Sequence, residues 1–134
     1  MAKTKLSESA IKLIDGKNFG NVAFVMDKGT PHVSPVWVDR EGDLILVNTH
    51  EGRVKSKYLK EGSKVALSVF NQEDPYEKVV IRGHVVERTK KGAAEHIDKM
   101  SKKYWGKEKY PYHQPGVDRI LVKIQPDHIS KEVG

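Results

Sequence analysis

The segment GDLILVNTHEGRVKSK, residues 42–57, carries the pattern that decides the fold and points to a site. Its first part, residues 42–48, is an apolar run of strand length, and the part after it has the composition of a short basic helix. The junction between the two collects a hydroxyl, a glycine and three cations, namely Thr49, Gly52, Arg53, Lys55 and Lys57. A strand-to-helix junction with these residues predicts an anion site.

A phosphate is the anion that suits this junction best. The first N–H groups of a helix and the positive end of its dipole attract anions. Arg53 can bind two phosphate oxygens at once, whereas lysines act as mobile point charges. The segment has neither the Walker spacing nor the GxGxxG spacing, which argues against a nucleoside-triphosphate or Rossmann site. A solvated basic helix face is the alternative that the local pattern leaves open.

Around this segment, the sequence predicts a mainly β fold. Apolar runs bounded by short turns predict six strands, at residues 22–26, 32–38, 44–48, 64–70, 78–87 and 119–124. Gly83 suggests a bulge or a close backbone approach within the fifth strand, and Pro126 is expected to end the sixth. Antiparallel strands joined by short hairpins predict a small closed or nearly closed barrel, since closure removes exposed sheet edges.

Two helices are expected in addition to the basic one. Apolar residues recur at helical spacing near the N-terminus and again after the fifth strand, where Thr89 is the expected N-cap: Leu6, Ala10, Leu13 and Ile14, then Ala93, Ile97, Met100 and Tyr104. Residues 105–116 form an aromatic, proline-containing loop. Its aromatic residues, with Tyr104, either wall a pocket or hold the loop onto the barrel or a partner subunit.

The composition limits the classes of function. A chain of 134 residues is expected to form one domain, and the formal net charge of +6 favours anionic ligands. No cysteine is present, and the six histidines are too scattered for a zinc site, so no metal is expected. No apolar run reaches the length of a membrane span and residues 1–5 lack a signal-peptide core, so we expect a cytoplasmic protein.

Five segments, taken in order, resemble a known family. They are HVSPVWV (32–38), VNT (47–49), GRVKSK (52–57), VALSV (65–69) and DRILVKIQP (118–126). Together they are similar to the pyridoxamine 5′-phosphate oxidase-like split-barrel family, in particular its small branch of flavin- or deazaflavin-dependent oxidoreductases. The resemblance runs from about residue 19 to about residue 129. It implies a six-stranded antiparallel split β-barrel of the FMN-binding type, a single domain over residues 1–134, and a homodimer with cofactor sites at the subunit interface.

The resemblance also implies an activity and a set of cofactor-binding residues. The cofactor would be FMN or coenzyme F420, and the reaction a transfer of hydride or electrons to or from a small organic substrate. The matching positions place the phosphate at Thr49, Arg53, Lys55 and Lys57. They place the ring along the strand with Ser34, Pro35, Val36 and Trp37, and the residues beneath the cofactor at Val47 and Asn48. Lys78 would reach the cofactor from the other subunit.

Two departures argue against activity on pyridoxamine phosphate. Lys78 stands where the oxidases proper have glutamine, and their C-terminal Arg and His pattern is not recognisable after residue 129. A cation at position 78 suits the anionic reduced form of a flavin-like ring. No catalytic residue is identified by the pattern, because a redox cofactor carries the electron chemistry itself.

Two other functions remain open from the sequence. One is a non-catalytic flavin-binding or carrier protein. The other, which the residues favour less, is a nucleic-acid-binding protein, because residues 88–109 combine basic side chains with aromatic ones on a small barrel.

Overall fold

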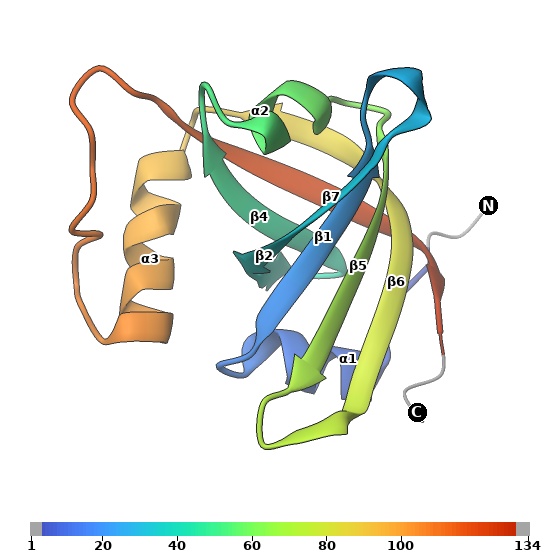
Figure 1. Cartoon of the computed structure of the whole chain (residues 1–134). Helices are drawn as coiled ribbons and strands as arrows, with labels where there is room; N and C mark the ends of the chain where they lie inside the picture. The colour runs from blue at the N-terminus through green and yellow to red at the C-terminus, as the bar shows by residue number, and fades with distance from the viewer. Residues whose placement is uncertain (1–3, 131–134) are drawn as a thin grey trace.

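One antiparallel sheet of seven strands organises residues 4–130, the part of the chain that the computed structural model describes (Figure 1). The strand order across the sheet is β2-β1-β5-β6-β7-β4-β3. In chain order the strands are β1 (Phe19–Val25), β2 (Pro31–Trp37), β3 (Asp39–Glu41), β4 (Leu44–His50), β5 (Lys64–Asn71), β6 (Asp74–Thr89) and β7 (Arg119–Ile129). The helices are α1 (Glu8–Asp15), a short 3-10 turn η1 (Asp27–Gly29), α2 (Val54–Tyr58) and α3 (Ala93–Trp105).

The mainly β, split-barrel prediction is confirmed, with seven strands in place of six. The additional strand is β3, which forms from residues expected to be a turn and pairs with β4. The sheet does not close, because β2 and β3 lie at its two edges. The fifth strand, predicted at residues 78–87, also begins earlier, since β6 already starts at Asp74.

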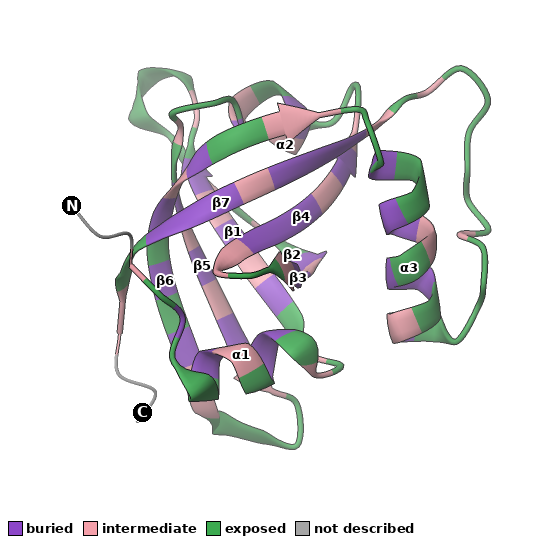
Figure 2. Ribbon diagram, turned by 180° about the vertical axis from the view of Figure 1, so that it is seen from behind, coloured by how far each residue is buried: buried purple, intermediate pink, exposed green. Residues whose placement is uncertain are grey.

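The burial pattern shows which faces of the sheet are covered. Along β5, buried residues alternate with more exposed ones, as in a strand with one face on the core. Along β4 and β7, burial is nearly continuous, because α3 packs on the outer face of these two strands (Figure 2). Helix α1 covers one end of the barrel and directs Ala10, Leu13 and Ile14 into the core (Figure 1).

The last strand passes through Pro126 and continues to residue 129, so the prediction that this proline ends the strand is wrong. A register shift between Arg82 and Gly83 sets Gly83 opposite Pro126. The bulge accommodates a residue that has no N–H to donate to the ladder. Gly83 also meets β7 very closely, because a Cβ atom built there would lie 2.3 Å from the Gln125 carbonyl oxygen. The close approach expected at Gly83 is therefore confirmed, whereas the extra residue of the bulge is Asp127 on β7.

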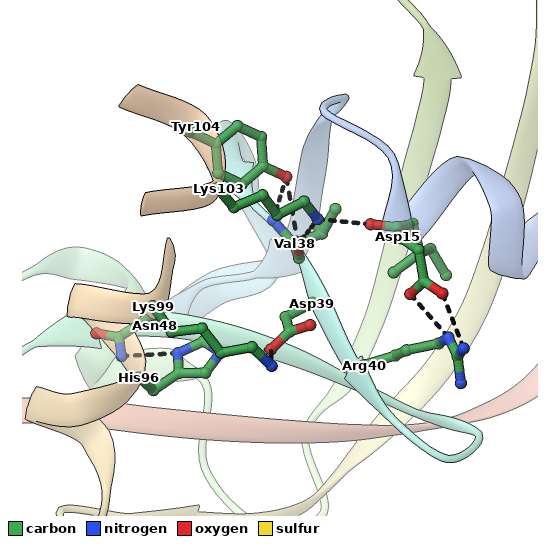
Figure 3. A network of polar contacts seen from close by, with 10 residues as sticks. Asp15, Val38, Asp39, Arg40, Asn48, His96, Lys99, Lys103 and Tyr104 are labelled. Carbon is green, nitrogen blue, oxygen red and sulfur yellow. Dashed lines mark hydrogen bonds and ion pairs between the residues drawn. The ribbon is translucent and has the colours of Figure 1, made fainter. Parts of the chain in front are cut away.

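Helix α3 begins later than predicted and is anchored at its far end. Its N-cap is Gly92 in the left-handed conformation, whereas Thr89 is the last residue of β6 and its Oγ1 accepts a hydrogen bond from the Lys91 amide. The buried Tyr104 hydroxyl accepts a hydrogen bond from the Val38 amide at 3.1 Å (Figure 3). It donates one to the Asn18 carbonyl at 2.7 Å. Burial raises the pKa of Tyr104 to about 12, so the hydroxyl keeps its proton.

Replacement of Gly83 by alanine is expected to destabilise the protein by about 1–3 kcal/mol, because the backbone of β6 must move away from the Gln125 carbonyl. The free energy of unfolding in urea measures this change. Arg82→Ala, at the exposed neighbouring position, serves as the control and should stay within about 0.5 kcal/mol of the parent. Equal effects of the two substitutions would contradict the close approach.

Tyr104→Phe is expected to cost on the order of 1–3 kcal/mol of stability, because it leaves the Val38 amide and the Asn18 carbonyl without their shared partner. Tyr112→Phe is the matched control, since Tyr112 is 66% exposed. Thermal or urea unfolding of both variants tests the prediction, which fails if Tyr104→Phe is as stable as Tyr112→Phe.

Candidate functional site

A cavity of about 320 Å³ lies between the sheet and α3. Strands β2 and β4, the start of α2, helix α3 and the start of β7 all contribute to it. Its lining residues are Phe19, Pro35, Val36, Trp37, Asn48, Thr49, His50, Arg53, Lys55, Ile97, Trp105, Tyr110 and Arg119. The volume falls in the range of small-molecule and cofactor sites.

The cavity is strongly cationic. Arg53, Lys55 and Arg119 line it, and no Asp or Glu of the described chain does. Burial, together with the charges of Arg53 and Arg119, lowers the pKa of Lys55, and burial is also the main cause of the lowered pKa of Arg119. Like charges held together without a carboxylate are costly unless an anion joins them.

Thr49 adds a neutral donor beside these cations. Its side chain is 2% exposed, and within residues 4–130 its Oγ1 is the one buried side-chain polar atom that has no hydrogen-bond partner. A buried hydroxyl without a partner in the protein is satisfied by water or by a ligand. The hydroxyl and the cations together form a donor set suited to an anion.

Neighbouring side chains orient Arg53 and Lys55. Arg53 Nε donates to His50 Nε2 at 3.0 Å, and His50 Nδ1 donates to the Glu51 carbonyl at 2.8 Å. His50 is therefore a neutral imidazole that accepts from the arginine. Lys55 Nζ donates to Ser34 Oγ at 3.3 Å, which ties α2 to β2. Since α2 has five residues, its dipole adds less to anion binding than the side chains do.

Aromatic rings form another part of the cavity wall. Trp37 meets Trp105 edge-on with centroids 4.5 Å apart, and Trp105 stacks on Tyr110 at 5.9 Å. The Arg119 guanidinium lies 5.3 Å from the centroid of the Tyr110 ring. Asp98 on α3 accepts a hydrogen bond from the Tyr110 amide at 2.7 Å and so holds the aromatic loop in place. The cavity thus combines aromatic rings with a group of cations.

A second cavity of about 290 Å³ adjoins the first under the aromatic loop. The two cavities share His50, Arg53, Tyr110 and Arg119, so both arginines border both spaces.

The structure brings most of the sequence-predicted residues to this cavity. The ones that line it are Pro35, Val36, Trp37, Asn48, Thr49, Arg53 and Lys55. Ser34 adjoins it through its hydrogen bond with Lys55, and Val47 is fully buried in the core. Lys57 lies 3.9 Å from Asp27 and lines a different cavity. Lys78, on β6, does not line the cavity of its own chain.

Arg119 is a site residue that the sequence pattern did not single out. Tyr110 and Trp105 were among the aromatic residues for which a pocket wall was one of two hypotheses, and the structure places both in the wall. Arg119 lies far along the chain from the basic segment and reaches it because β7 pairs with β4, with His50 opposite Arg119. The sequence pattern did not show that these two strands pair, so it could not place Arg119 beside the basic segment.

The described chain has no features of a membrane-spanning helix or of a metal centre. Between residues 4 and 130, no helix has the length and apolar character needed to cross a bilayer. The same residues contain no group of three or more His, Cys, Asp or Glu side chains arranged to hold a metal ion.

Comparisons with known proteins agree on the fold. An F420 reductase structure superposes with a TM-score of 0.79 at 24% sequence identity, covering 93% of this chain and 98% of that one. An FAD- and heme-binding protein from Mycobacterium smegmatis gives a TM-score of 0.65 at 17% identity, covering 100% of this chain and 74% of that one. A putative pyridoxamine 5′-phosphate oxidase from Listeria innocua gives 0.62 at 16% identity, covering 84% and 86%.

A search of curated proteins gives no match to the sequence. The family model described as pyridoxamine 5′-phosphate oxidase, however, matches residues 6–131, which is nearly the whole chain. The match covers all seven strands and the whole lining of the cationic cavity. The chain therefore belongs to the pyridoxamine 5′-phosphate oxidase family.

Proposed function

We propose that the protein is an oxidoreductase that binds a phosphorylated flavin or deazaflavin, FMN or coenzyme F420, in the cationic cavity. The observation that carries this proposal is the meeting of three cations and the unpartnered Thr49 hydroxyl with an aromatic wall in one cavity. A ligand that satisfies both parts has a planar aromatic body and an anionic group. Family membership and the likeness to an F420 reductase and to an FAD- and heme-binding protein support the same class of ligand.

The residues of the cavity fit such a cofactor. Arg53, Lys55 and Arg119 would hold its phosphate, and Thr49 would donate the hydroxyl that lacks a partner in the protein. Trp37, Trp105 and Tyr110 would exclude water from the face of the ring. When bound, a flavin or deazaflavin supplies the hydride or electron transfer, so the protein needs to contribute orientation and electrostatics.

We also propose that the cofactor exchanges hydride or electrons with a small organic substrate, and the adjoining cavity supports this. It lies against the same two arginines and has phenol and imidazole groups from the aromatic loop, Tyr110, Tyr112 and His113. A molecule in this space would lie beside a cofactor held in the larger cavity.

We further propose that the protein acts as a homodimer whose partner completes the site. Two of the lining aromatic residues are open to solvent, Phe19 at 43% exposure and Trp105 at 46%. A second copy would cover this apolar edge. Lys78 would then contribute to the cavity of the other subunit, since it does not line its own.

A carrier that binds the cofactor without catalysis remains the alternative. An enzyme turns over the bound cofactor with a substrate, whereas a carrier does not. Oxidation of the reduced cofactor by members of a panel of small acceptors, at a rate above that of free cofactor, identifies an enzyme.

Nucleic-acid binding is favoured less by the arrangement of the basic residues. Many cations of the 88–109 segment are engaged within the protein. Lys90 pairs with Glu51 and Asp118, while Arg88 and Lys103 donate to backbone carbonyls. A titration with single-stranded DNA at low salt tests this alternative, because binding through phosphates weakens steeply as salt is added.

The cofactor proposal predicts tight binding of FMN, of F420, or of both by the purified cofactor-free protein. Riboflavin, which lacks the phosphate, should bind at least about tenfold more weakly than FMN if FMN is a ligand, because a charge-assisted contact is worth on the order of 1.5–3 kcal/mol. Fluorescence titration measures both affinities. A folded protein that binds neither FMN nor F420 would refute the proposal.

The proposed position of the phosphate predicts which lysine and arginine substitutions weaken cofactor binding most. Arg53→Ala and Lys55→Ala should each weaken cofactor binding by about ten- to a hundredfold. Lys57→Ala should have a smaller effect, because Lys57 faces Asp27 and lines a different cavity. Lys64→Ala, exposed on β5, is the control for the loss of one positive charge. If Lys57→Ala loses as much affinity as Lys55→Ala, the phosphate lies nearer to Lys57 than proposed.

A further inference from the structure

The Asn48 amide joins the cavity to a buried polar network behind it. Its oxygen accepts a hydrogen bond from Arg119 Nε at 2.8 Å. Its nitrogen donates to the Ala93 carbonyl at 2.9 Å and to His96 Nδ1 at 3.1 Å. The network continues from His96 Nε2 to Asp39 at 3.0 Å and from Asp39 to Lys99 at 3.1 Å (Figure 3).

We propose that His96 and Asp39 are positioning residues for the anion site: they set the orientation of the Asn48 amide, which in turn holds Arg119 at the cavity. The role in cofactor binding rests on the function proposed above. The chain of hydrogen bonds from Asp39 through His96 and Asn48 to Arg119 does not depend on that function.

Donor and acceptor chemistry allows one consistent pattern along this network. The Asn48 nitrogen can only donate, so His96 Nδ1 must accept. The proton of the neutral imidazole is then on Nε2, where it is donated to the Asp39 carboxylate. Asp39 is suited to this role. Burial works to raise its pKa, but hydrogen bonds from His96, the Arg40 amide and Lys99 outweigh burial and lower it.

The reverse orientation of Asn48 is unfavourable at both ends. A flipped amide would present its NH₂ group to Arg119 Nε–H, so that two donors would meet. The amide oxygen would face the lone pair of His96 Nδ1. As long as Asp39 keeps the imidazole proton on Nε2, the amide oxygen faces the arginine.

The network is well placed to act on the site without contacting a ligand. His96 and Asp39 are 8% and 7% exposed and do not line the cavity, whereas Asn48 and Arg119 do. With Nε engaged by Asn48, the terminal nitrogens of Arg119 are the donors that can turn to an anion. Loss of the bond to Asn48 would free the guanidinium to adopt other rotamers and weaken its grip on the anion.

Two substitutions of His96 separate this role from simple packing. In His96→Asn, the amide oxygen can take the place of Nδ1 and accept from Asn48. In His96→Gln, the amide group reaches the place of Nε2, so Asp39 keeps a partner, whereas Asn48 loses the imidazole acceptor and keeps only the Ala93 carbonyl. We expect His96→Gln to weaken FMN or F420 binding by about fivefold and His96→Asn to lose less affinity than His96→Gln.

A double-mutant cycle with Arg119→Gln tests whether the effect passes through the arginine. In the Arg119→Gln background, His96→Gln should change cofactor affinity by less than about twofold, because the residue on which it acts is gone. An equal loss in both backgrounds would overturn the proposal, as would equal losses in His96→Gln and His96→Asn.

Nitrogen NMR of the cofactor-free protein provides a readout independent of the ligand. In the parent protein, the ¹⁵N shifts of His96 should identify the neutral tautomer with the proton on Nε2, and the Arg119 Nε–H should be protected from exchange. In His96→Gln that protection should fall, and in His96→Asn it should be retained in part. A proton on Nδ1 of the parent, or unchanged protection in His96→Gln, overturns the proposal. If neither FMN nor F420 binds, the proposed function is refuted, but the NMR signals of His96 and Arg119 still test the hydrogen-bond network.

Discussion

The antiparallel pairing of β4 with β7 is the constraint on which the site depends. It sets His50 opposite Arg119 and Asn48 opposite Leu121, and so brings the start of the last strand beside the basic segment. Helix α3 can then pack across both strands and close the cavity with Trp105 and Ile97. Without this pairing, the cations on α2 would face solvent and Asn48 would have no arginine to orient.

The site is assembled at some cost to the stability of the free protein. Lys55 and Arg119 are half-buried near Arg53 without a carboxylate, and Thr49 buries a hydroxyl that no protein group satisfies. Such local violations of the rules that stabilise a fold occur at functional sites, where a ligand restores the balance. The nearby acidic residues Glu51 and Asp118 form salt bridges with Lys90. They therefore do not neutralise the positive potential of the cavity.

Sequence periodicity predicted six of the seven strands and both longer helices, and the errors have physical causes. Strand β3 was missed because a three-residue edge strand made of charged residues has no apolar period, and it exists because β4 supplies the ladder. Pro126 did not end β7, because the register shift beside it, with Asp127 as the extra residue on β7, accommodates a proline opposite Gly83. Thr89 did not cap α3, because β6 extends through it and a left-handed Gly92 makes the turn.

By itself, the sequence determined the mainly β architecture, the basic junction at residues 49–57 and the family resemblance, because these depend on local period and on residue type at short spacing. Only the tertiary structure decided which cations share a cavity. It turned Lys57 toward Asp27 and added Arg119, and it linked Asn48 through His96 to Asp39. These contacts join residues distant in the chain, and strand pairing and helix packing set them rather than any spacing along the sequence.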